Sequence, residues 1–284
     1  MFTNPIHPIK ALFLDIDGTL VASDETISPR VRQTLQCVRE MGVEVVLCTG
    51  RTRWRLRPIL HQVPAPVGYV ITSNGSVMYH VETGVTHYRH LMPIPLALKV
   101  IRLVLEAGSE PYVFEDSDRL DVEGSRVLFH PDRPVGEWAE FPRYRSYTEI
   151  AENLPFEPVS VSAFGHPSIM RPLAAHLIEA SKGELSIIQT GSAETWGVEI
   201  YVANISKQLG VESVAKRLNL SRTELMAIGD HINDIEMLQW AGIGVAMGNA
   251  QPEVRAVADW ITSDVESDGV AHAIERCVLN PALV

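Results

Sequence analysis

Apolar and polar positions follow a regular rhythm over the first third of the chain. Largely apolar runs alternate with stretches in which apolar residues recur at helical spacing, and the first such helix is bracketed by Ser28-Pro29 and Gly42. Continuous apolar runs predict strands that are buried on both faces, and alternation with helices predicts a parallel sheet with right-handed crossovers. The runs are Ala11–Leu14, Val43–Cys48 and Tyr69–Thr72.

The rhythm changes after Asn74-Gly75. A hairpin, a helix, several short strands and a strand–helix–strand unit follow, which predicts an α+β unit with a largely antiparallel sheet. From about Ser206 the alternation returns and can complete the first sheet. We therefore predict an α/β fold with a doubly wound, Rossmann-like core and an inserted α+β domain. The expected boundaries are 1–82 and 191–284 for the core and 83–190 for the insertion.

Composition and charge narrow the possible partners. The chain has 46% hydrophobic and 21% charged residues, which is ordinary for a globular protein, and its net charge is −11. Such an acidic surface repels nucleic acid and anionic membranes, so neither is an expected partner. The three cysteines fit no zinc site and suggest a reducing compartment. With neither a signal-peptide pattern nor a run near the ~20 apolar residues of a spanning helix, we expect a cytoplasmic protein.

The first candidate site is the segment Asp15-Ile16-Asp17-Gly18-Thr19-Leu20, which follows the first apolar run. Open α/β sheets bind ligands at the carboxyl ends of their strands. Two nearby carboxylates repel, so one of them tends to hold a proton or a cation, and Gly18 permits close approach of a ligand. The alternative is a plain acidic turn in which Thr19 caps the next element, and this segment alone does not decide between the two.

A second acidic segment, Gly229–Asp234, follows the apolar run Leu225–Ile228. Its acids should lie on the same sheet edge as Asp15 and Asp17, and several converging carboxylates indicate a cation. Oxygen ligands without a His/Cys set favour a hard ion, Mg²⁺ before Ca²⁺ or Zn²⁺. Alternatively, Asp230 or Asp234 merely caps the next helix.

Two further segments could contact an anion. Thr49-Gly50-Arg51 ends the second run, where a hydroxyl and free N–H groups are suited to phosphate oxygens, although an ordinary helix cap would look the same. Lys207 begins a helix, which is the end that the helix dipole disfavours for a cation. It is therefore either placed to meet an anion or is a solvated surface lysine.

Taken in order, these segments resemble the four motifs of the haloacid dehalogenase (HAD) superfamily. The resemblance spans the whole chain and is to the Cof-type phosphatase branch with a type IIB-like α/β cap. Gln208 departs from the pattern, because the family often has glycine after the lysine of the third motif. The motifs are Asp15–Leu20, Thr49–Arg51, Lys207 and Gly229–Asp234, with further matching stretches at Glu236–Leu238, Gly244–Ala250 and Asp268–Ala271.

The resemblance implies a role for each motif residue. Asp15 attacks phosphorus and forms an aspartyl-phosphate, and Asp17 protonates the leaving oxygen and then activates water. The implied metal residues are Asp15, Asp17 through its main-chain carbonyl, Asp230 and Asp234. Whether Asp234 binds the ion directly or through water stays open, and it could also orient Lys207. The implied contacts to the phosphoryl group are Thr49, Lys207, Gly18, Gly50, Arg51 and Asn233.

The predicted function is that of a Mg²⁺-dependent phosphatase acting on small phosphorylated metabolites such as sugar phosphates. A phosphomutase on the same core and a non-catalytic phosphometabolite-binding protein are the alternatives. A dehalogenase would not need Asp17, Asp230 and Asp234, and a P-type pump would need spanning helices. Neither the substrate nor the oligomeric state is specified by the sequence.

The inserted domain is expected to act as a mobile cap that excludes water from the site. Its two crossings, near residues 81–84 and 189–192, contain small residues that could hinge. Four of its basic side chains could contact the leaving group of the substrate, although plain solvated charges are the better explanation. They are His130, Arg133, Arg143 and Arg145.

Overall fold

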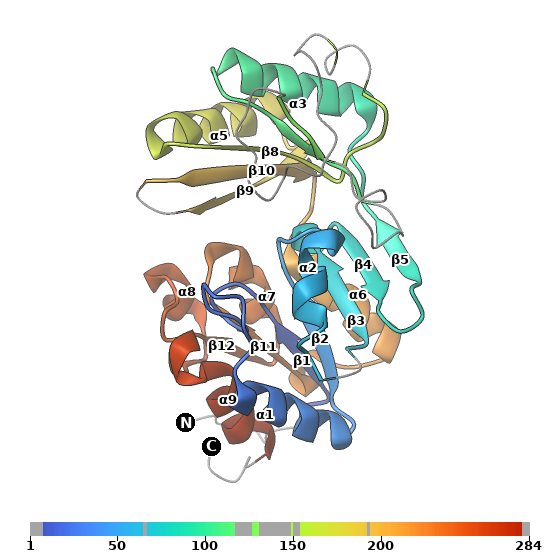
Figure 1. Cartoon of the computed structure of the whole chain (residues 1–284), viewed down its shortest axis with the longest axis vertical. Coiled ribbons are helices and arrows are strands. Elements are labelled where there is room, and N and C mark those ends of the chain that lie inside the picture. Colours follow the sequence, from blue (N-terminus) through green and yellow to red (C-terminus); the bar gives the residue numbers. More distant parts are fainter. Residues whose placement is uncertain are drawn as a thin grey trace. The chain divides into compact units, whose positions relative to one another are not determined.

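The structure, a computed structural model, describes residues 8–64, 67–116, 127–130, 149, 154–191 and 194–279. The chain divides into two compact units, each with its own sheet (Figure 1). The first unit contains Met1–Arg51, Arg55–Tyr88 and Ser206–Val284, and the second contains Thr52–Trp54 and Arg89–Ile205. The domain boundaries expected from the sequence, and the action of the insertion as a cap, stay predictions.

The first unit is built on an eight-stranded sheet in the order β13-β12-β11-β1-β2-β3-β4-β5. Strands from β13 to β3 pair in parallel, and β4 runs antiparallel to β3. The central strand β1 pairs with β11 on one side and with β2 on the other. The strands are β1 (Ala11–Leu14), β2 (Glu44–Cys48), β3 (Tyr69–Thr72), β4 (Val77–His80), β5 (Thr86–Arg89), β11 (Leu225–Gly229), β12 (Ile243–Ala246) and β13 (Trp260–Ile261).

Burial explains why these segments are strands. Every residue of β1, β11 and β12 is buried, so each reads in the sequence as an uninterrupted apolar run. The first helix begins where predicted, with the side chain of Ser28 accepting from the N–H of Val31 and Pro29 in the first turn. The α-helices are α1 (Pro29–Glu40), α2 (Arg53–Leu60, whose first two residues belong to the second unit), α6 (Lys207–Leu218), α7 (Ile235–Trp240), α8 (Pro252–Val257) and α9 (Gly269–Ile274). Short 3₁₀ helices lie at η1 (Ser73–Gly75), η4 (Arg222–Glu224), η5 (Ile232–Asp234) and η6 (Val265–Ser267), and a π-helix lies at η7 (Glu275–Leu279).

The second unit is an α+β structure. Its five-stranded sheet has the order β7-β6-β8-β10-β9, and all of its described pairings are antiparallel. Two helices pack against this sheet, α3 (Ile94–Glu106) and α5 (Pro167–Ser181). The predicted fold class, a doubly wound sheet with an inserted α+β unit, is thus confirmed. The strands are β6 (Tyr112–Phe114), β7 (Val127–Leu128), β8 (Ser160–Gly165), β9 (Leu185–Gly191) and β10 (Trp196–Val202).

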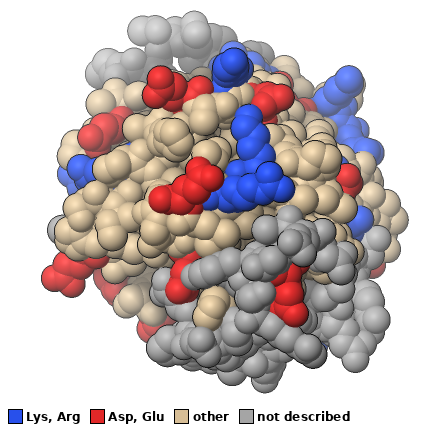
Figure 2. All heavy atoms as spheres, turned by 90° about the horizontal axis from the view of Figure 1, so that it is seen from above, with Lys and Arg blue, Asp and Glu red and all other residues tan. Residues whose placement is uncertain are grey.

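Charged side chains of both signs lie on the surface. In the view from above (Figure 2), positive and negative side chains are interspersed among uncharged ones. Within the described residues, no helix has the length and apolar character needed to cross a membrane. Exposed charged residues of α3 and α5 include the basic Lys99, Arg102 and Arg171 and the acidic Glu106 and Glu179.

A glycine lets helix α6 approach the sheet closely. A Cβ atom at Gly210 would lie 2.5 Å from Cγ2 of Ile71, a fully buried residue of β3. Such a distance is far inside van der Waals contact, so only glycine fits without a shift of the helix or the strand. Because α6 begins at Lys207, this packing also fixes the backbone position of that lysine relative to the sheet.

We predict that Gly210→Ala lowers the free energy of unfolding by about 1–3 kcal/mol through overpacking. Helix propensity alone predicts the opposite, an increase of about 1 kcal/mol in the free energy of unfolding, because alanine favours helices more than glycine does. Urea unfolding measures the difference, with Lys216→Ala on the exposed side of the same helix as the control. A more stable Gly210→Ala protein would show that α6 does not need this close approach.

Candidate active site

The site lies where three neighbouring parallel strands end. Asp15 follows β1, Thr49 follows β2, and Asp230 follows β11, and these strands are adjacent in the sheet. The N–H of Asp15 still donates to the carbonyl of Ile228 at 3.0 Å, and that of Thr49 to Ile71 at 2.9 Å. The backbone is therefore held in sheet-like pairing up to the residues that carry the chemistry, so their positions follow from the strand order.

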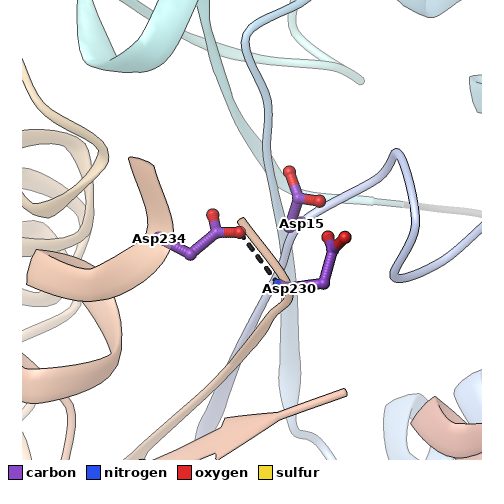
Figure 3. A group of neighbouring side chains, drawn as sticks. All are labelled: Asp15, Asp230 and Asp234. Atoms are coloured by element: carbon purple, nitrogen blue, oxygen red, sulfur yellow. Dashed lines mark hydrogen bonds between the residues drawn. The ribbon is translucent and has the colours of Figure 1, made fainter. Parts of the chain in front are cut away.

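Three aspartates converge at this edge (Figure 3). One carboxylate oxygen from each of Asp15, Asp230 and Asp234 lies within 4.8 Å of the others. The first two come from the segments after β1 and β11, and Asp234 ends the short turn η5. Oxygen atoms in this arrangement could hold a hard cation.

Lys207 also belongs to this cluster, although it follows the inserted segment in the sequence. Its Nζ donates to Oδ1 of Asp15 at 2.5 Å and to Oδ1 of Asp234 at 2.6 Å, and the residue is only 1% exposed. Burial alone would lower the pKa of Lys207, but the charges of Asp15 and Asp234 raise it above its ordinary value. The ammonium group therefore stays charged, and Lys207 is not a solvated surface lysine.

The carboxylates of the cluster carry more negative charge than one lysine offsets. Burial raises the pKa of Asp15 well above its usual range, and the charge of Asp234 adds to this against the effect of Lys207. Burial and the charge of Asp234 raise the pKa of Asp230 to about 6, although the hydroxyl of Thr19 donates to it at 3.0 Å. Both shifts mean that the cluster favours an added positive charge, either a proton or a metal ion.

Asp234 uses both of its oxygens within the protein. While Oδ1 accepts from Lys207, Oδ2 accepts from the N–H groups of Asp230 and His231, each at 3.0 Å (Figure 3 marks the first). The residue is fully buried. Asp234 therefore fixes both the loop that carries Asp230 and the ammonium group of Lys207.

Asp17 lies apart from the acidic cluster and pairs with Arg51. Nε of Arg51 donates to Oδ2 of Asp17 at 2.9 Å, and Nη2 donates to Oδ1 at 2.5 Å. The same Nη2 lies 2.6 Å from Oε1 of Glu25. Arg51, which the family resemblance places on the phosphoryl group, thus has its guanidinium on two carboxylates in this structure. A ligand role for the main-chain carbonyl of Asp17 stays a prediction.

Thr49 and Gly50 lie beside two asparagines. Oγ1 of Thr49 accepts from the N–H of Arg51 at 3.0 Å, and the carbonyl of Thr49 accepts from the N–H of Asn74, also at 3.0 Å. Nδ2 of Asn233 donates to Oδ1 of Asn74 at 2.8 Å, and a Cβ at Gly50 would lie 3.2 Å from Nδ2 of Asn74. The asparagine pair thus ties the end of β2 to the turn that carries Asn233.

Asn74 is a site residue that the sequence analysis missed. Its backbone is left-handed with φ of 54°, and its neighbours Ser73 and Gly75 have φ of 49° and 105°. Asparagine tolerates this conformation better than most residues. In the sequence, the Asn74-Gly75 pair indicates only the point at which the alternation of strands and helices ends.

Gly18 is held between Asp230 and another residue missed at first, Asn249. A Cβ at Gly18 would lie 2.4 Å from Oδ2 of Asp230, and φ of Gly18 is 81°, so no other residue fits. Nδ2 of Asn249 donates to the carbonyl of Gly18 at 2.8 Å. Asn249 lies in one of the stretches that resemble the family, but nothing in its spacing indicated this contact.

The residues suggested for the leaving group lie mostly outside the described part of the chain. Arg133, Arg143 and Arg145 are not among the described residues, and neither is Ser192 of the second suggested hinge. His130 is described and belongs to the second unit. Contacts of these residues to a substrate stay predictions.

Comparisons with known proteins identify the family of the chain. Residues 12–274 match the family model described as haloacid dehalogenase-like hydrolase. The chain is 28% identical to the 5-amino-6-(5-phospho-D-ribitylamino)uracil phosphatase YcsE of Bacillus subtilis (strain 168), over 95% of this chain and 96% of the relative. It is also 28% identical to the pyridoxal phosphate phosphatase YbhA of Escherichia coli (strain K12), over 93% of this chain and 97% of the relative.

The fold has a close counterpart among solved structures. BT4131, described as a sugar phosphatase of HAD subclass IIB, superposes with a TM-score of 0.74 at 22% identity, over 97% of this chain and 100% of that chain. At this identity the likeness concerns the fold, including its inserted α+β unit. The predicted resemblance to the Cof-type branch with a IIB-like insertion is confirmed. With its motifs, its sheet and its family match in agreement, the chain belongs to the haloacid dehalogenase-like hydrolases and is a phosphatase of that family.

Proposed function

We propose that this protein is a Mg²⁺-dependent phosphatase that hydrolyses small phosphorylated metabolites through an aspartyl-phosphate at Asp15. The observation that carries the proposal is the contact between Asp15 and Lys207 beside Asp230 and Asp234, at the carboxyl ends of the parallel strands. A buried carboxylate held by an ammonium group and next to a cation site has the environment of an activated nucleophile.

Lys207 and Thr49 supply the groups that a transferring phosphoryl needs. Its charge is spread over three oxygens in the transition state, so fixed donors and cations lower the barrier. The ammonium of Lys207 is already directed at Oδ1 of Asp15, so a phosphorus atom attacked by Asp15 would arrive beside a positive charge. Thr49 is fully buried at the end of β2, and its hydroxyl would face the same oxygens.

The acidic cluster supports a role for Mg²⁺, whose ligands in this proposal are Asp15, Asp230 and the main-chain oxygen of Asp17. When bound, the ion neutralises the carboxylates and the phosphoryl oxygens. The donor set fits, because the buried acids are oxygen ligands and their raised pKa values show an excess of negative charge. We assign Asp234 an indirect role, because Lys207 and two N–H groups already engage its two oxygens.

Asp17 is proposed to transfer the proton. Its side chain is 58% exposed, in contrast to the buried Asp15, so it can reach both a leaving group and a water molecule. Once one of its two oxygens is released from Arg51, it would protonate the leaving oxygen in the first step and remove a proton from the attacking water in the second. Hydrolysis of the aspartyl-phosphate then returns Asp15 to its carboxylate form.

The family match supports small phosphomonoesters as the substrate class. Two relatives with the same identity of 28% act, by their names, on a phosphoribitylamino uracil and on pyridoxal phosphate. Their leaving groups differ widely although both are small, so this identity supports the class and not an individual substrate. A phosphomutase would use the same core chemistry with a sugar hydroxyl in place of water.

We predict Mg²⁺-dependent release of inorganic phosphate from a panel of phosphorylated metabolites and aryl phosphates. Asp15→Asn should lower kcat/KM by about 10³-fold or more, because it removes the nucleophile. Glu40→Gln, on the exposed face of α1, serves as the matched control and should keep full activity. Failure of the wild type to exceed the Asp15→Asn background across the panel would rule out hydrolysis, and an isomerised sugar phosphate without phosphate release would identify a mutase.

We also predict that stabilisation by Mg²⁺ depends on pH. The pKa of Asp230 is raised to about 6 in the metal-free protein, above the value near 4 of an unfolded chain. The folded state therefore binds this proton more tightly, and its contribution to stability is lost as pH rises through about 6. Below that pH, Mg²⁺ must displace the proton, so its affinity should fall about tenfold per pH unit.

Calorimetric melting with and without Mg²⁺ tests this expectation. Mg²⁺ should raise Tm clearly at pH 7.5 and much less at pH 5, and Asp230→Asn should remove the difference. The comparison at each pH cancels the contributions of titrating groups that do not bind the ion. An equal rise in Tm at both pH values would contradict the assignment of Asp230 as a ligand.

A further inference from the structure

We infer that Glu25 is a positioning residue for Asp17 and acts through the guanidinium of Arg51. The inference rests on the proposed function and deepens it, because it concerns how the proton-transfer group is held. Glu25 lies in the segment between β1 and α1, outside every motif of the site. Its carboxylate nevertheless reaches the arginine that binds Asp17.

Arg51 is engaged along its whole guanidinium group. Nε and Nη2 form a two-pronged contact with the two oxygens of Asp17, and Nη2 also contacts Oε1 of Glu25 at 2.6 Å. Nη1 donates to the main-chain carbonyl of Arg55 at 3.2 Å. A planar fork held on three sides has one orientation, which makes it suitable for orienting a carboxylate.

Asp17 needs such a partner because its side-chain torsions do not fix the orientation of its carboxylate. The final torsion of an aspartate side chain is broad, so the plane of an isolated carboxylate is poorly defined. At 58% exposure, packing does not hold it either. Both of its oxygens contact Arg51, which has only 8% of its side chain exposed. The plane of the Asp17 carboxylate therefore follows the plane of the Arg51 guanidinium.

Glu25 itself is held in place by a strained backbone and a glutamine. Its φ is 56°, a left-handed conformation that is unfavourable for glutamate. Gln62 bridges the segment, since its Nε2 donates to the carbonyl of Glu25 at 2.8 Å and its Oε1 accepts from the N–H of Ile27 at 3.0 Å. Strain that neighbouring contacts maintain often marks a functional residue. Here it directs the Glu25 side chain to Arg51.

The consequence for the reaction concerns the leaving group. Proton donation in the transition state needs the acid within hydrogen-bonding reach and correctly oriented. An alcohol or phenol that leaves reluctantly depends on that proton, whereas a nitrophenolate leaves readily without it. Loss of the Glu25 contact should therefore slow reactions with poor leaving groups selectively. A general loosening of the site would slow all of them equally.

The test compares two substrates of nearly the same shape, phenyl phosphate and 4-nitrophenyl phosphate, with the full chain and Mg²⁺. The quantity measured is kcat/KM, because it reports formation of the aspartyl-phosphate and excludes the later hydrolysis step. In Glu25→Gln we expect kcat/KM to fall about tenfold for phenyl phosphate, a part of the 10²–10⁴-fold that general acids contribute. For 4-nitrophenyl phosphate the value should stay within about threefold.

A second variant separates positioning from folding. Glu25→Asn suits the left-handed backbone and so should melt no lower than the wild type, but its side chain is too short to reach Arg51. It should show the same selective loss. Asp24→Asn is the matched control, because this neighbouring exposed carboxylate accepts from the N–H and the hydroxyl of Thr26 and should leave both substrates unaffected when it is replaced.

The outcomes separate this inference from the proposed function. Wild-type turnover of both aryl phosphates that Asp15→Asn abolishes supports the function in the same assay. An equal loss on both substrates in the Glu25 variants, or no loss on either, would then overturn the positioning role alone. No wild-type turnover of either substrate would overturn the function and this inference together.

Discussion

The contact of one buried ammonium group with two buried carboxylates is the constraint on which the site depends. Lys207 is separated from Asp15 by the whole inserted unit, yet Nζ lies 2.5 Å from Asp15 and 2.6 Å from Asp234. Removing one partner would leave uncompensated charge in a medium that stabilises it poorly, at a cost of about 3–5 kcal/mol. The carboxyl ends of β1 and β11 must therefore lie close to the first residue of α6. The inserted segment must also bring the chain back to this place.

Close backbone approach is what lets this contact form. Gly210 brings α6 against Ile71 of β3, and Gly18 lets its backbone pass next to the carboxylate of Asp230. Neither glycine bears a reactive group. A Cβ at Gly210 would collide with Ile71 and one at Gly18 with Asp230, so either would displace an element that carries a charged side chain of the site.

The sequence predicts those parts of the fold and site that local physics determines. Buried parallel strands are apolar runs, so β1 and β11 can be located from the sequence, and acids after such runs indicate one sheet edge. The partners of Asn74, Asn249 and Glu25 could not be predicted in this way. They are polar loop residues that reach the site only through tertiary contacts. Because such residues are common in any sequence, their type alone does not mark them as site residues. Neither spacing nor resemblance indicated that Arg51 would bind Asp17.

Asp15 and Asp17 are two residues apart and are chemically identical, so their environments must account for any division of labour. Asp15 is 4% exposed and shares Lys207 with Asp234, whereas Asp17 is 58% exposed and is bound by Arg51. A nucleophile benefits from burial beside a fixed cation, because water would solvate it and slow its attack. An acid and base must instead reach solvent and leaving group in turn, which an exposed carboxylate can do. The fully buried Ile16 stands between these two environments, and thus between the two proposed roles.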